Sequence, residues 1–113
     1  MKLQFELALA ADPALVMQII GKPADEWQQR LLRNRYPRMM LNCSRQAGKS
    51  TATSCIALLE AIQHAPALVL VICPSLRQSK EFLRQVSIFA KRLGIRPIGE
   101  STTHIELANG SRI

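Results

Sequence analysis

The chain has 113 residues, which is the size of one small domain, and its formal net charge of +7 is a large basic excess for that length. Its hydrophobic fraction of 48% excludes a disordered chain, and its longest apolar run, residues 67–73, is too short to cross a bilayer. The basic excess fits polyanionic partners, such as nucleic acid or nucleotide phosphates, as well as it fits a basic surface without a partner.

No targeting segment or metal-ligand spacing is visible. Glu6 and Asp12 interrupt the N-terminal apolar stretch, so we expect no signal peptide, no membrane contact and a cytoplasmic location. The cysteines Cys43, Cys55 and Cys73 form no C-x-x-C pair and have no histidine at ligand spacing. We expect them to be small buried residues in a reducing compartment.

The first third of the chain predicts two short helices. Asp12-Pro13 is a helix start, and the segment from Pro13 to Ile20 is expected to end at Gly21. A second helix is predicted over residues 25–33, with acids in its first turn and arginines in its last turn, as the helix dipole prefers. Residues 1–22 are therefore expected to be a helical extension, and residues 23–113 the main domain.

The rest of the chain predicts alternating strands and helices. Residues 38–42 and 67–73 are extended apolar runs, and the second is aliphatic enough for a strand covered on both faces. Helices are expected over about 48–63 and 75–93. Asn109-Gly110 predicts a β-hairpin turn, and the chain stops inside the second strand of this hairpin. This order predicts an α/β, P-loop NTPase-like fold with a mainly parallel sheet flanked by helices, incomplete, with a C-terminal β-hairpin.

The segment Cys-Ser-Arg-Gln-Ala-Gly-Lys-Ser-Thr, residues 43–51, carries the parts of a phosphate-binding loop. Gly48 allows close backbone approach, Lys49 supplies charge for the β- and γ-phosphates, and Ser50 offers a hydroxyl to Mg²⁺. Thr51 follows on the α-phosphate side. The alternative is an ordinary loop with a glycine at a helix start.

This segment resembles the variant Walker A motif of the large terminase subunit of tailed bacteriophages, which commonly has S-R-Q-x-G-K-[ST] and lacks the first glycine, here Cys43. Trp27-Gln28 resembles the adenine-recognition motif of that family. Residues 70–75 with Gln78-Ser79, and residues 105–113, resemble the family's next strand and helix and its later hairpin. The resemblance covers residues from about 23 to the end.

The resemblance implies an ATP-binding portion of a viral DNA-packaging motor in the bacterial host cytoplasm. ATP and Mg²⁺ would be the cofactors, and double-stranded DNA, the portal and the small terminase subunit the partners, with an oligomer only for the longer parent. Lys49 would hold the phosphates, Ser50 the metal, and Arg45 would act as an arginine finger. The nucleotide-binding residues would be Trp27, Gln28, Ser44, Arg45, Gln46, Ala47, Gly48, Lys49, Ser50 and Thr51.

Each of these roles has an alternative. Arg45 can be a solvated loop residue, Trp27 a core residue and Gln28 a surface residue. The helix from Ser75 carries basic residues along one face, which can touch DNA phosphates or be solvated: Arg77, Lys80, Arg84 and Lys91.

The chain also lacks a Walker B acid at the end of an apolar strand, and it lacks the acidic cluster of a nuclease. We therefore expect weak nucleotide binding from this chain and ATP hydrolysis only from a longer parent. Another nucleic-acid translocase or helicase, and an inactive prophage remnant, are the alternative functions.

Overall fold

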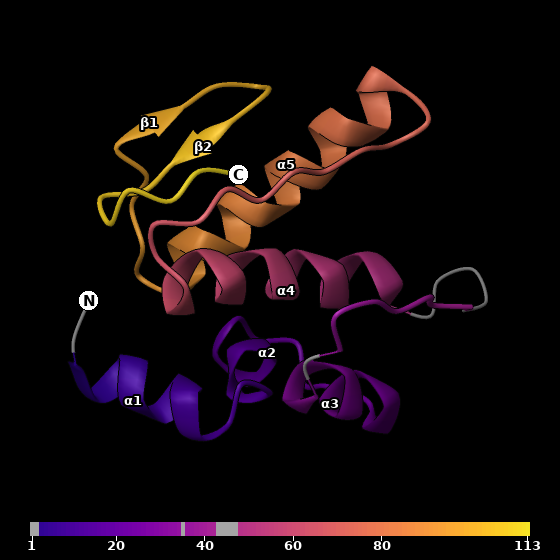
Figure 1. Ribbon diagram of the computed structural model, residues 1–113, viewed down its shortest axis with the longest axis vertical. Helices are drawn as coiled ribbons and strands as arrows, with labels where there is room; N and C mark the ends of the chain where they lie inside the picture. Colours follow the sequence, from indigo (N-terminus) through magenta and orange to yellow (C-terminus); the bar gives the residue numbers. More distant parts are fainter. Residues whose placement is uncertain (1–2, 35, 43–47) are drawn as a thin grey trace.

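The computed structural model describes residues 3–34, 36–42 and 48–113 (Figure 1). Three helices come first: α1 (Leu3–Ala11), α2 (Leu15–Ile19) and α3 (Glu26–Arg33). Two longer helices follow, α4 (Lys49–Gln63) and α5 (Leu76–Arg92), and then the short strands β1 (Gly99–Glu100) and β2 (Ile105–Glu106). The chain is therefore mostly helical in the part that the structure describes.

Helix α4 lies at the centre of the structure. It packs against α5 on one side and against α1, α2 and α3 on the other (Figure 1). Seven of its residues are buried, and they come from several sides of the helix: Ala52, Ser54, Cys55, Ala57, Leu58, Leu59 and Ala61. A helix that is apolar around most of its circumference needs neighbours on more than one side, so α4 organises helix-on-helix layers.

The N-terminal helices belong to the same hydrophobic core as the rest of the chain. Leu9, Val16 and Met17 are buried in one cluster with Leu58 and Phe89. Residues 1–22 were predicted to be a separate extension, and in the structure α1 and α2 contribute core side chains. The helix at Leu3–Ala11 was also missing from the prediction, because that stretch has almost no apolar periodicity.

The prediction of a mainly parallel sheet is wrong for the described residues. The described residues form one sheet, the antiparallel pair of β1 and β2, in which Gly99 pairs with Glu106 and Glu100 with Ile105. Residues 38–42 form no strand, and residues 67–73 contribute a single parallel bridge, between Leu68 and Arg112. The P-loop NTPase-like architecture expected from the order of the elements is therefore not the one observed.

The physical reason lies in what covers the aliphatic run. Leu68, Leu70 and Ile72 are 69%, 77% and 85% exposed, whereas Val69 and Val71 pack against the core. A parallel sheet needs cover on both faces, and the α1–α3 layer that could have supplied the second face lies against α4 instead.

The expected turn at Asn109-Gly110 is present. Leu107 N–H donates to the Ser111 carbonyl at 2.9 Å, and Ile105 and Ile113 exchange backbone hydrogen bonds of 2.8 and 2.9 Å. Gly110 has a φ of +91°, which is the left-handed region that such a turn requires. Asn109 Nδ2 also donates to the Ala61 carbonyl at 2.9 Å, and this bond joins the turn to the last part of α4.

Candidate functional site

The start of α4 carries the part of the predicted phosphate loop that the structure describes. Gly48 is the N-terminal flanking residue of the helix, with a φ of +85°, and its carbonyl accepts the first helical hydrogen bond, from Ala52 N–H at 3.0 Å. The N–H groups of the first helical turn have no acceptor within the helix and therefore favour an anion. Lys49 and Ser50 are exposed and Thr51 is half-buried in this turn.

The side chains of Lys49 and Ser50 make no hydrogen bond or ion pair to the residues that the structure describes. Their carbonyls accept side-chain hydrogen bonds from Thr53 Oγ1 at 2.9 and 3.1 Å, and the Ser50 carbonyl also accepts one from Ser54 Oγ at 2.7 Å. As far as the described residues extend, the ammonium of Lys49 and the hydroxyl of Ser50 are therefore open to a ligand at this end of α4. The predicted loop residues Ser44, Arg45, Gln46 and Ala47 lie outside the described residues.

Gln28 holds the beginning of α4 in place. Its Nε2 donates to the Gly48 carbonyl at 2.9 Å, and its Oε1 accepts from Asp25 N–H at 2.9 Å. The residue is only 4% exposed, and a Cβ atom on Gly48 would collide with Gln28 Nε2. Gln28 therefore links the first turn of α3 to the glycine that opens α4.

This geometry bears on the predicted adenine contact. Both ends of the Gln28 amide already have one backbone partner, so an adenine could use only the second N–H and the second lone pair of the amide oxygen, or would have to displace one of these bonds. Trp27 is half-buried on the same helix. Adenine recognition by Trp27 and Gln28 stays a prediction, and the structure adds a positioning role for Gln28.

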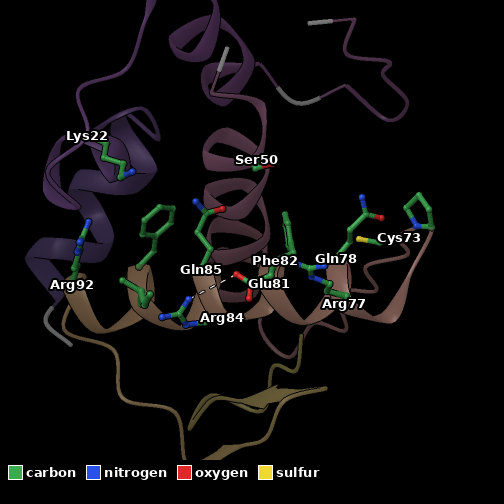
Figure 2. Close-up of a pocket in the computed structure, with 13 residues that line it drawn as sticks. Lys22, Ser50, Cys73, Arg77, Gln78, Glu81, Phe82, Arg84, Gln85 and Arg92 are labelled. Carbon is green, nitrogen blue, oxygen red and sulfur yellow. Dashed lines mark ion pairs between the residues drawn. The ribbon is translucent and has the colours of Figure 1, made fainter. Parts of the chain in front are cut away.

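A groove of about 650 Å³ runs along α5, and Ser50 of α4 lies beside its middle part (Figure 2). Its lining includes four cationic side chains, Lys22, Arg77, Arg84 and Arg92. Figure 2 shows Ser50 on α4 facing the side chains of α5 across this groove, with Lys22 at the end nearest Arg92. The part of the chain that the structure describes supplies one acid to the lining, Glu81, which lies 3.8 Å from Arg84.

The basic residues of α5 divide into two sets. The sequence predicted one stripe with Arg77, Lys80, Arg84 and Lys91, but Lys91 pairs with Glu100 at 3.6 Å and Lys80 does not line the groove. The groove takes Arg77 and Arg84 from that stripe and adds Lys22 and Arg92, which sequence reasoning did not single out. Arg77, Arg84 and Arg92 are spaced by seven and eight residues, a helical repeat that could have identified them.

The cysteines and acids offer little other chemistry in the described residues. Burial raises the pKa of the Cys55 thiol to about 12, and the residue is fully buried, as predicted. No group of three or more His, Cys, Asp or Glu side chains that could hold a metal occurs in residues 3–34, 36–42 and 48–113.

Within the described ranges, none of the helices has both the length and the apolar character that a membrane span requires. Comparisons of the chain with known protein families, with curated proteins and with solved structures found no match.

Proposed function

We propose that this chain binds the phosphates of ATP, together with Mg²⁺, at the start of α4, as the ATP-binding portion of a viral DNA-packaging motor. The observation that carries the proposal is the junction at Gly48. A glycine in the left-handed region opens a 15-residue helix, and the next two residues present an exposed ammonium and an exposed hydroxyl that have no side-chain partner among the described residues. These are the groups that a triphosphate with its metal requires.

Each residue has a distinct task in this proposal. The unpaired N–H groups of the first turn and the positive end of the helix dipole attract the phosphate oxygens. Lys49 neutralises the outer phosphates, and the Ser50 hydroxyl is a ligand for Mg²⁺, which supplies further charge neutralisation when bound. Gln28 holds the Gly48 carbonyl through its Nε2 and so fixes the glycine at the start of α4 relative to α3.

The role in DNA packaging rests on the S-R-Q-A-G-K-S-T sequence of residues 44–51 and on the basic charge of the chain. ATP binding in this proposal needs no parallel sheet, because the anion contacts come from the loop and the helix terminus. ATP hydrolysis needs an acidic residue in addition. The chain has no acid in a Walker B position, so we expect it to bind ATP without turnover.

Titration with a fluorescent ATP analogue in the presence of Mg²⁺ tests the proposal. We expect saturable binding by the intact chain and a loss of affinity of at least about tenfold in Lys49→Ala, since a charge-assisted contact to phosphate is worth more than about 1.4 kcal/mol. Lys80→Ala is the matched control, because it removes the same charge from an exposed position of α5 and should leave the affinity unchanged.

Circular dichroism of each variant shows that the fold is kept. A folded wild-type chain that does not bind the analogue would overturn the proposal and favour an inactive remnant. Equal affinity in wild type and Lys49→Ala would reject the site at α4.

A further inference from the structure

We infer that the groove between α4 and α5 binds a single strand of nucleic acid, which lies along α5 from Arg77 to Arg92. The inference goes beyond the proposed function, because the groove shares only Ser50 with the phosphate loop, runs along α5 beyond it, and the strand would be bound without ATP. It rests on the charge of the groove lining, on two cations that are held in position, on the length of the groove and on its apolar residues (Figure 2).

The charge of the lining favours a polyanion. Lys22, Arg77, Arg84 and Arg92 line the groove together with a single described carboxylate, Glu81. The Glu81 side chain is 67% exposed and pairs with Arg84 at 3.8 Å, so the other three cations have no ion pair with an acid of the described lining. Arginine at most of these positions suits phosphate, because the guanidinium can donate two parallel hydrogen bonds.

The cations at one end of the groove are held in position. Lys22 Nζ and Arg92 Cζ lie 5.8 and 5.9 Å from the centre of the Phe89 ring, and Arg92 Nη1 donates to the Ile20 carbonyl at 3.1 Å. Long basic side chains normally lose rotamer freedom when they bind a ligand. Here part of that loss has already occurred on folding, so these two cations can bind a phosphate at a smaller entropic cost.

The length of the groove distinguishes a strand from a single nucleotide. Arg77 and Arg92 are fifteen residues apart on one helix, which corresponds to about 22 Å along its axis. The phosphates of one nucleotide cannot reach both ends of such a groove. A strand with one phosphate per nucleotide can meet all four cations in turn.

The apolar part of the lining favours a single strand over a duplex. Phe82 is half-buried and Ile88 is 39% exposed, and both lie in the groove among the cations. Unpaired bases can stack on an aromatic ring and cover aliphatic surface, whereas a duplex hides its bases and offers phosphates alone. A volume of about 650 Å³ is also that of a ligand groove and is too small to enclose a duplex.

Fluorescence anisotropy with a labelled oligodeoxynucleotide of about 12 nucleotides tests the inference on the intact chain. We expect Arg77→Ala/Arg84→Ala to weaken binding at least about tenfold, and to lower the slope of log Kd against log salt by about 1.4, because each phosphate contact to a single strand contributes about 0.7. We expect Phe82→Leu to weaken binding of the oligonucleotide while leaving the affinity for inorganic polyphosphate unchanged.

The matched control is Lys80→Ala/Arg96→Ala, which removes the same charge from exposed sites outside the groove and should change Kd by less than about twofold. Equal losses in the two double variants would overturn the inference, because binding would then follow net charge alone. A duplex that binds as tightly as the single strand, or polyglutamate that competes equally well with it, would also overturn it.

ATP-analogue binding is measured on the same samples, so a failure of the proposed ATP site can be distinguished from a failure of the proposed strand-binding groove. Loss of strand binding in Arg77→Ala/Arg84→Ala with normal analogue binding is the result that we expect, because these two arginines lie on α5 and outside the phosphate loop. If the wild-type chain binds the analogue and no oligonucleotide, strand binding in the groove is overturned and the ATP site is not.

Discussion

Gly48 is the residue on which the candidate phosphate site depends most. Its φ of +85° lies in the left-handed region, where any other residue is strained, and Gln28 Nε2 occupies the space that a Cβ atom would need. The two constraints act at one position, so backbone conformation and side-chain packing both specify glycine there.

We predict that Gly48→Ala lowers the free energy of unfolding by about 2–3 kcal/mol, which combines the backbone strain with the collision. Gly94 is the matched control. It has a φ of +81° with nothing within 4 Å of its would-be Cβ, so Gly94→Ala carries only the backbone strain of about 1 kcal/mol. Urea unfolding of the two variants measures the difference.

The collision can be isolated in a double-mutant cycle. Gly48→Ala should cost less in a Gln28→Ala background than in the wild type, because the amide is then absent. Equal costs in both backgrounds would show that Gln28 does not restrict this position.

At this scale, several features could be predicted from sequence. Ser75 caps α5 as expected, with its Oγ accepting from Gln78 N–H at 3.3 Å, and the Gly48-Lys49-Ser50 start of α4 is where the motif indicated. The bond between Gln28 and Gly48 could not be predicted, because it joins residues twenty positions apart and depends on how α3 packs against α4.

At the scale of the elements, an ion pair joins the end of α1 to the end of α3. Arg33 Nε and Nη2 donate to the two carboxylate oxygens of Asp12 at 2.9 and 3.1 Å. Asp12 Oδ1 also accepts from Ala14 N–H at 3.2 Å, at the start of α2. The hydrogen bonds from Arg33 lower the pKa of Asp12 from its ordinary 3.8, and the pKa of Arg33 is raised in turn.

This shift predicts a pH-dependent contribution to stability. The carboxylate form is favoured in the folded state, so the contribution is fully present above about pH 4–5 and is lost as the pH falls through the lowered pKa. The difference in melting temperature between wild type and Asp12→Asn should therefore be present at neutral pH and absent near pH 2. The effect is small, because both side chains are partly exposed.

Arg33→Gln provides the partner measurement. It should remove the same pH-dependent component as Asp12→Asn, and the double variant should show no further loss. A difference that stays constant from neutral pH to pH 2 would contradict the assignment of the shift to this pair.

At the scale of the whole molecule, every helix except α1 could be predicted, and the arrangement of the helices could not. The segments of α3, α4 and α5 carry clear helical signals, with acids in the first turn of α3, a glycine before α4 and a serine cap on α5. The aliphatic run of residues 67–73 is different, because a continuous apolar sequence does not reveal whether one face or both faces are covered. That choice depends on where α1–α3 pack, and they pack on α4.

The exposed side of this run gives the sharpest test of the architecture. The structure covers Val69 and Val71 and leaves Leu68, Leu70 and Ile72 in solvent. We predict that Leu68→Ser/Leu70→Ser/Ile72→Ser changes the free energy of unfolding by less than about 1 kcal/mol, as surface substitutions do. The same variant should lower the fluorescence of the dye ANS, because it removes an exposed apolar patch.

Val69→Ser/Val71→Ser is the complementary variant. These side chains pack against the core, so their loss should lower the free energy of unfolding by about 1–3 kcal/mol, in spite of the smaller number of substitutions. If the triple variant proved as destabilising as this double variant, both faces of the run would be covered in solution. That outcome would contradict the arrangement in which α1–α3 pack on α4 and one side of the run faces solvent.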